Sequence, residues 1–131
     1  MRYLLDTNII TDLIRNPKGR VAERVRAVGR QAVCTSVIVA AELRFGVAKN
    51  PSLRLETRVN EALQALYVAT FETPADVTYG AIRASLERQG RPIGGSDLFI
   101  AAHAITLGCT LVTANEREFA RIEGLKCENW L

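Results

Sequence analysis

Apolar residues along this chain fall into two arrangements: short continuous runs, and longer segments in which apolar positions recur every three or four residues. The short runs have the length of buried strands and are bounded by polar or turn-forming residues. Four of them are clear, at residues 2–6, 32–34, 67–71 and 110–113. A fifth, within residues 124–131, predicts a strand at the edge of a sheet.

The periodic segments between these runs predict helices. They cover residues 9–14, 19–29, 37–49, 52–66, 75–89 and 97–107, with a further short helix after residue 114. Asn50-Pro51 joins the third and fourth of them into a helical hairpin. Strands that alternate with helices predict a parallel sheet with helices on both faces. We therefore expect one α/β domain over residues 1–131, with three α/β/α layers and a central, mostly parallel sheet of four to five strands.

The segment at residues 97–107 is apolar on every side, which is typical of a helix that crosses the core. Ser96 is expected to be its N-cap, and Gly108 is expected to end it in a left-handed conformation. Its first turn carries Asp97, a carboxylate that burial disfavours unless a partner replaces the lost hydration. Two interpretations of Asp97 stay open: it only complements the helix dipole, or it binds a cation.

A second acid, Asp6, ends the first predicted strand. In parallel α/β sheets, ligands bind beyond the carboxyl ends of the strands, which is where Asp6 is expected. Thr7 and Asn8 follow as candidate caps of the next helix, and Asp6 is itself a good N-cap. On local grounds alone, capping is the simpler interpretation of Asp6.

A third acid, Glu42, lies in the helix after the second strand, which Thr35 or Ser36 is expected to cap. Its neighbours at helical spacing are apolar: Val37, Ile38, Ala41 and Phe45. Glu42 is therefore expected on or beside the buried side of that helix rather than on a solvated face. The alternative is an ion pair with an arginine of a neighbouring helix.

In a parallel sheet, Asp6, Glu42 and Asp97 converge at the carboxyl edge of the strands. Crowded carboxylates repel one another unless a cation lies between them. Oxygen ligands without His or Cys suit Mg²⁺ or Mn²⁺. Such a metal lowers the pKa of a bound water and directs it at a phosphodiester. We expect Asp6 and Asp97 to be direct ligands, with Glu42 as a ligand or as the base that orients the water.

Composition narrows the choice of metal and compartment. His103 is the only histidine and the three cysteines form no CxxC pair, so zinc chemistry is poorly supported; His103 is expected to pack or to bond a backbone carbonyl. The odd cysteine count favours a reducing cytoplasm, and no apolar run is long enough to cross a membrane.

The net charge is +3, and all but three of the 17 basic residues are arginine. Arginine suits phosphate, but charge alone does not establish an RNA partner.

Four motifs, in order along the chain, resemble those of the PIN domain, specifically the VapC-type toxins. They are LDTN at residues 5–8, AELRFG at 41–46, IGGSDL at 93–98 with IAAHA at 100–104, and LVT at 111–113 with REF at 117–119. The resemblance implies a Mg²⁺- or Mn²⁺-dependent endoribonuclease, the toxin of a type II toxin–antitoxin pair, that cleaves tRNA or ribosomal RNA loops. It also implies a homodimer, a VapB-type antitoxin as partner, and contact with DNA only through that antitoxin.

By the motif match, Asp6, Glu42 and Asp97 take the metal-site positions of the family. Supporting polar roles fall on Thr7, Asn8, Ser36, Thr113, Asn115 and Glu118. One position departs from the pattern, because many members place a fourth acid shortly after the equivalent of Thr113, where Asn115 stands here. Asn115 adds no charge, so a second metal is not favoured, and Glu118 is expected to cap its short helix.

Two other functions stay open. A PIN-like module that binds RNA or protein without cleaving it is favoured by Asn115 and disfavoured by the presence of all three acids. A phosphotransferase with a nucleophilic Asp6 usually needs a second acid two residues later, where Asn8 stands. Metal-dependent cleavage of RNA separates the nuclease from the binding module.

Overall fold

The computed structural model describes residues 1–131 and contains one five-stranded sheet in which every pair of neighbouring strands is parallel. The strands are β1 (Tyr3–Leu5), β2 (Val33–Ser36), β3 (Tyr67–Ala69), β4 (Thr110–Val112) and β5 (Cys127–Glu128). Their spatial order is β3-β2-β1-β4-β5. The predicted sheet is confirmed, including the edge position of the last strand.

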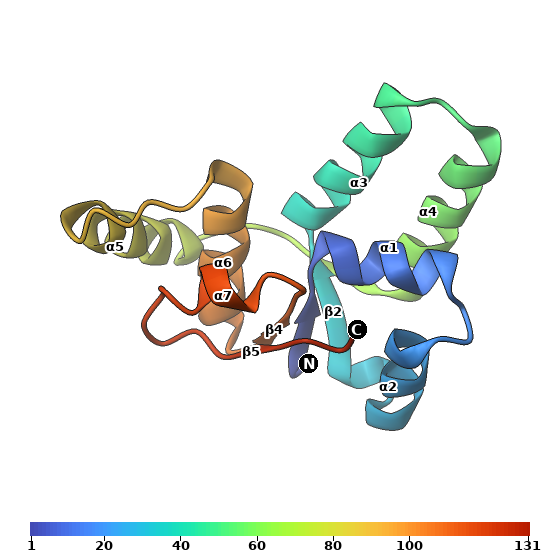
Figure 1. Ribbon diagram of the computed structural model, residues 1–131, viewed down its shortest axis with the longest axis horizontal. Helices are drawn as coiled ribbons and strands as arrows, with labels where there is room; N and C mark the ends of the chain where they lie inside the picture. The colour runs from blue at the N-terminus through green and yellow to red at the C-terminus, as the bar shows by residue number, and fades with distance from the viewer.

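Helices cover both faces of this sheet, so the predicted three layers are confirmed (Figure 1). The helices are α1 (Thr7–Arg15), α2 (Arg20–Val28), α3 (Val37–Lys49), α4 (Leu53–Ala65), α5 (Ala75–Arg88), α6 (Gly95–Leu107) and α7 (Glu116–Phe119), with a 3-10 turn at Arg30–Ala32. The pair α5 and α6 lies to one side of the sheet, and α1, α2 and α4 lie to the other. None of these helices is both long enough and apolar enough to span a membrane.

The strand order places the site. From β1 the chain moves outward to β2 and β3, and it then returns to the other side of β1 to form β4 and β5. Strand β1 is therefore the point where the connections change direction, and a crevice opens beyond the carboxyl end of a strand at such a point. Asp6 is the first residue after β1.

Helix α6 crosses the core as expected. Its fully buried residues include Ile100, Ala101 and Ala104, and Gly108 ends it in a left-handed conformation with φ of 69°. The expected cap at Ser96 is wrong, because the helix begins two residues earlier than predicted, at Gly95, and Gly94 is its N-cap without a side-chain bond. Ser96 thus lies inside the first turn rather than before it.

The predicted hairpin of α3 and α4 extends from one end of the sheet (Figure 1). Arg44 Nη1 donates to Asn60 Oδ1 at 2.7 Å and ties the two helices together. Helix α3 turns Val39, Ala40 and Leu43 toward the core, so the expectation that Val37, Ala41 and Phe45 mark its buried side is wrong. Phe45 is 66% exposed. A helix that is apolar all round does not reveal from sequence which side is buried.

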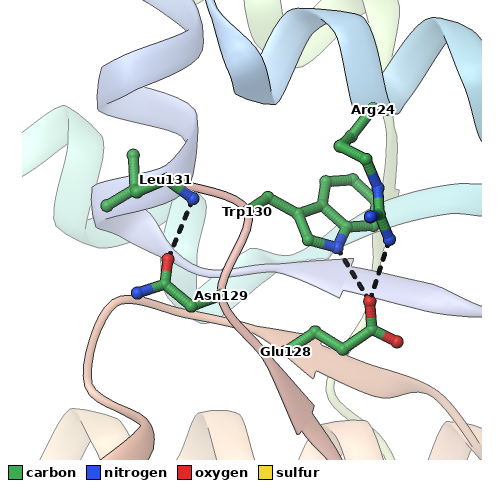
Figure 2. A network of polar contacts seen from close by, with 5 residues as sticks. All are labelled: Arg24, Glu128, Asn129, Trp130 and Leu131. Carbon is green, nitrogen blue, oxygen red and sulfur yellow. Dashed lines mark hydrogen bonds and ion pairs between the residues drawn. The ribbon is translucent and has the colours of Figure 1, made fainter.

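The end of the chain is fastened to α2 and β1. Trp130 is buried and its ring lies edge-on to that of Tyr3, with centroids 5.0 Å apart. Glu128 accepts from Trp130 Nε1 at 2.9 Å and pairs with Arg24 at 3.1 Å, and the Arg24 guanidinium lies over the indole (Figure 2). This network anchors the short strand β5 at the edge of the sheet.

Candidate active site

A cavity of about 580 Å³ opens at the carboxyl edge of the sheet. Only one of its 11 lining residues is hydrophobic. The lining consists of Asp6, Thr7, Asn8, Thr11, Asp12, Arg15, Asn16, Glu42, Asp97, Asn115 and Leu131. The three acids singled out from sequence, Asp6, Glu42 and Asp97, therefore share one cavity, to which they come from the end of β1, from α3 and from α6.

Asp6 is held rigidly at the floor of this cavity, with 2% of its surface exposed. Its Oδ1 accepts from the backbone N–H of Thr7 at 2.8 Å, so Asp6 rather than Thr7 or Asn8 caps α1. Its Oδ2 accepts from the hydroxyl of Thr113 at 2.8 Å. Capping is thus one of the roles of Asp6, and the cap directs the carboxylate into the cavity.

Burial raises the pKa of Asp6 above its ordinary value, because a charged carboxylate loses hydration there. The hydrogen bonds from Thr113 and Thr7 act in the opposite direction, and the nearby negative charge of Glu42 raises the pKa further. The two donors stabilise the ionised form that a cation would need.

Glu42 is half-buried on α3 and faces α1. The hydroxyl of Thr7 donates to its Oε1 at 2.6 Å, which fixes the carboxylate over the cavity. The alternative of an ion pair with a neighbouring arginine is wrong, because the only ion pairs in the structure are Arg24–Glu128 and Arg83–Glu87. No positive side chain of the protein neutralises Glu42.

Asp97 lies in the first turn of α6, where the helix dipole favours a negative charge. Its pKa is nevertheless raised to about 6, first by burial and then by the negative charges of Asp6, Glu118 and Glu42. The helix end alone therefore does not compensate for the crowding of acids. A cation placed among them would do so.

Polar residues after β4 tie the cavity to α1. The Thr113 hydroxyl, which donates to Asp6, also accepts from the backbone N–H of Asn115 at 3.1 Å. Asn8 Oδ1 accepts from the backbone N–H of Ala114 at 3.2 Å. Asn115 lines the cavity, whereas Glu118 does not, and its side chain caps no helix. Glu118 acts on the site through its charge, which raises the pKa of Asp97.

Ser36 lies beneath the site rather than in it. It is fully buried, and it caps α3 by accepting from the backbone N–H of Ile38 at 3.0 Å, as expected. Its hydroxyl also lies 2.7 Å from Nδ1 of His103, an interaction that the sequence did not indicate. His103 Nε2 donates to the carbonyl oxygen of Thr70 at 3.0 Å, as the expectation of a backbone partner required. Burial lowers the pKa of His103, which keeps the ring neutral.

The donor chemistry of the cavity fits a hard divalent cation, since its acids offer oxygen ligands and leave their charges uncompensated. The structure contains no group of three or more His, Cys, Asp or Glu side chains that could hold a metal ion. Hard divalent cations do not require such a group, because they often complete their coordination with water.

One side of α1 also lines the cavity, through Asn8, Thr11, Asp12 and Arg15, and the C-cap residue Asn16 continues it. Asn8 was predicted from the sequence, whereas the other four residues were not. The signal was present in their spacing, because positions three and four apart share one side of a helix, while Ile9 and Ile10 are buried on the other. Asp12 Oδ1 accepts a hydrogen bond from the Asn16 amide at 2.8 Å, so one oxygen of this carboxylate already has a partner beside α1.

An all-parallel α/β sheet with carboxylates gathered beyond its central strand is compatible with nucleases and with other phosphate-transferring enzymes, and the comparison with known proteins decides between them. The PIN domain matches residues 3–125. The chain belongs to the PIN-domain family and, within it, to the VapC ribonucleases.

Individual relatives match over their full length. The chain is 37% identical to the tRNA(fMet)-specific endonuclease VapC of Shigella flexneri over 131 residues. The alignment covers 99% of this chain and 98% of the relative. It is 36% identical over 132 residues to ribonuclease VapC2 of Rickettsia felis, with the same two coverages.

Two solved structures are similar throughout. VapBC2 of Rickettsia felis bound to a promoter DNA fragment matches with a TM-score of 0.92 and 35% identity over 100% of both chains. DNA-bound VapBC of Salmonella typhimurium matches with a TM-score of 0.90 and 36% identity, over 100% of this chain and 99% of that one.

Proposed function

We propose that this chain is a divalent-metal-dependent endoribonuclease that acts as the toxin of a VapBC-type toxin–antitoxin pair. The observation that carries the proposal is the shared cavity of Asp6, Glu42 and Asp97 in a chain of the VapC family. Their uncompensated negative charge supports a cation site, and Mg²⁺ or Mn²⁺ is the ion that oxygen ligands favour.

The proposed roles follow from the hydrogen bonds of the three acids. Asp6, fixed by Thr113 and by the N–H of Thr7, and Asp97, at the start of α6, are the direct ligands. Glu42 is a further ligand or accepts the proton of the attacking water, and Thr7 holds its carboxylate in place. A bound divalent ion supplies an activated water and stabilises the negative charge that develops during hydrolysis of a phosphodiester.

RNA loops are the proposed substrate, with tRNA or ribosomal RNA as the source. The name of the Shigella flexneri relative gives tRNA(fMet) as its target, which supports the tRNA alternative. The cavity is open and polar, and unpaired nucleotides of a loop reach such a site without the cost of opening a helix.

The proposed partners are a VapB-type antitoxin and a second copy of the chain. The two solved structures named above are both DNA-bound VapBC complexes, which supports an antitoxin that carries the contact with DNA. We further propose a cytoplasmic location, supported by three cysteines that form no disulfide.

A binding module without catalysis is the second candidate. Asn115 favours it, because this amide lines the cavity where many relatives of the family place an acid. The intact set of Asp6, Glu42 and Asp97, with the donors that orient two of them, favours the nuclease.

Cleavage of cellular RNA tests the proposal. Purified, antitoxin-free protein is incubated with total RNA in Mg²⁺, in Mn²⁺ and in EDTA, and the ends are mapped by sequencing. We expect discrete cuts with either metal and none with EDTA. The double variant Asp6→Asn, Asp97→Asn should lose the cuts, whereas Asp76→Asn, Glu123→Gln, which removes two exposed acids elsewhere, should keep them. Full cleavage by the first variant, or none by folded wild-type protein, would overturn the nuclease assignment.

A further inference from the structure

A second hollow of about 610 Å³ adjoins the acidic cavity at the far end of α1. Its eight lining residues are Asp12, Arg15, Asn16, Pro17, Lys18, Gly19, Arg20 and Leu131. Four of them, Asp12, Arg15, Asn16 and Leu131, also line the acidic cavity. The two hollows therefore form one continuous groove that runs along the polar side of α1 and into the α1–α2 turn.

The two ends of this groove differ in the charge of their side chains. Asp6, Glu42 and Asp97 line only the first hollow, Lys18 and Arg20 line only the second, and Arg15 lies where the two meet and lines both. None of these three basic side chains forms an ion pair in the structure. The one acid of the second hollow is Asp12, which accepts a hydrogen bond from the Asn16 amide. The three cations are thus exposed and available to an anion.

We propose that this basic hollow, formed by Arg15, Lys18 and Arg20, binds a phosphodiester of the RNA strand that flanks the linkage being cleaved. The proposal rests on the ribonuclease function proposed above. Arginine offers a planar fork of donors and lysine a compact charge, and both bind phosphate oxygens. The site takes a backbone phosphate and reads no base, so it holds strands of any sequence.

The length of α1 sets the spacing between the two ends. Helix α1 has nine residues, which at about 1.5 Å per residue puts Arg15 roughly 12 Å along the axis from Thr7. Lys18 and Arg20 lie beyond Arg15 in the chain and line only the second hollow, so they are placed to contact a different phosphodiester from the one at the metal site. A neighbouring phosphate of an extended strand is within their reach, since a phosphate recurs at every nucleotide.

The acidic end explains why such a hollow is needed. Carboxylates repel the phosphate backbone wherever a metal does not neutralise them, so the acidic cavity alone binds RNA poorly. Cations at the other end of the groove compensate for this repulsion and align the strand along α1. Their contribution is to binding rather than to the chemical step, so their removal is expected to raise KM and to leave kcat near its wild-type value.

Binding of a single-stranded RNA oligomer tests the proposal, with every protein carrying Asp97→Asn so that the RNA stays intact. The test variant is Lys18→Gln, Arg20→Gln. The control is Arg2→Gln, Lys126→Gln, which removes the same charge from a different cavity, one that includes Cys109 and Gly124. Fluorescence anisotropy gives Kd at several salt concentrations.

We expect the test variant to bind about tenfold or more weakly than the control. The slope of log Kd against log salt should fall by about 0.7 for each phosphate that the variant no longer binds. Equal binding by the two variants, or an equally weakened affinity in both, would overturn the proposal. The side chains of Lys18, Arg20, Arg2 and Lys126 are all exposed, and unchanged melting temperatures would show that both variants fold.

Cleavage with the otherwise wild-type protein separates this inference from the proposed function. If the wild type cuts RNA and the test variant shows raised KM with kcat unchanged, both hold. If the wild type cuts RNA and the test variant matches the control in KM, the proposal that the basic hollow binds RNA is wrong, whereas the proposed ribonuclease function is supported. If the wild type does not cut RNA, the nuclease is wrong, and the anisotropy experiment still decides whether the hollow binds RNA.

Discussion

The hydroxyl of Ser36 donates to Nδ1 of His103 across the boundary between β2 and α6, with 2.7 Å between the two atoms. The direction of this bond follows from the other side of the ring, where Nε2 faces the carbonyl oxygen of Thr70 and must carry the proton. Ser36 in turn accepts from the N–H of Ile38. This chain of bonds holds the start of α3, the helix that carries Glu42.

The Ser36–His103 pair is expected to act as a unit in stability. Ser36→Ala leaves Nδ1 without its donor and α3 without its cap, and should cost about 1–3 kcal/mol in the free energy of unfolding. His103→Ala should cost about as much or more, because it also opens a cavity. In a double-mutant cycle measured with urea, the two losses should be less than additive by about 1 kcal/mol. Additive losses would show that the two side chains are not coupled.

Removal of the Thr113 hydroxyl is expected to destabilise the protein at pH values above the pKa of Asp6. Thr113→Val keeps the side-chain shape but leaves Oδ2 of a buried carboxylate without its donor, which costs about 1.5–3 kcal/mol. The loss of stability should shrink as the pH falls and Asp6 becomes protonated. Unfolding by urea at several pH values measures it. Thr57→Val, which removes an exposed hydroxyl bonded within α4, should change stability by less than about 0.5 kcal/mol at each pH.

Asp97→Asn is expected to stabilise the metal-free protein. The folded-state pKa of Asp97, about 6, exceeds the ordinary value of 3.8, so ionisation in the folded state is unfavourable. The gain should be full above pH 6, should decline as the pH falls through that value and should vanish below about pH 4. Because Asp97 is only half-buried, we expect about 1 kcal/mol at most. Melting curves at several pH values, with Glu123→Gln as the control, would reveal this gain in stability. A gain that grew toward low pH would contradict the expected pH dependence.

Divalent metal is expected to stabilise the folded state through the same carboxylates. A ligand at 100 times its Kd adds about 2.7 kcal/mol to the free energy of unfolding. The melting temperature should therefore rise with Mn²⁺ or Mg²⁺ in the wild type. It should not rise in the double variant Asp6→Asn, Asp97→Asn, which lacks the proposed direct ligands. A rise of equal size in both proteins would place the metal elsewhere.

At the C-terminal network, packing is expected to outweigh the ion pair (Figure 2). The Arg24–Glu128 pair has side chains 50% and 40% exposed, so Glu128→Gln should cost less than about 1 kcal/mol. Trp130→Ala removes a buried ring from against Tyr3 and should cost about 3–5 kcal/mol. Chemical denaturation of the two variants compares them, and a larger loss of stability for Glu128→Gln would reverse the order.

The order of strands and helices was predictable because apolar runs such as those around Leu4 and Leu111 have no other stable place than a buried sheet. The three acids were predictable as neighbours because parallel strands bring their carboxyl ends to one edge. Sequence reasoning failed for Phe45, since a helix apolar on every side does not show which side the core will cover. It failed at Ser96 because Gly94 and Gly95 allowed the helix to begin earlier.

The hydrogen bonds that orient the acids were less accessible from sequence. Thr113 bonds Asp6 across 107 residues, and Ser36 bonds His103 across 67. Such pairs depend on the register of β1 beside β4 and on the position of α6, neither of which local patterns determine. The polar side of α1, by contrast, was predictable from the spacing of Asn8, Thr11 and Arg15.

The separation of Asp6 and Thr113 along the chain has a consequence during translation. Asp6 leaves the ribosome well before Asp97 and Thr113, and Thr113 lies 107 residues after Asp6. The acidic cavity does not exist until β4 has inserted beside β1, because the nascent chain forms structure only as it emerges. Until β4 has been made, the polypeptide therefore carries no assembled acidic cavity beside the RNA of the ribosome that makes it.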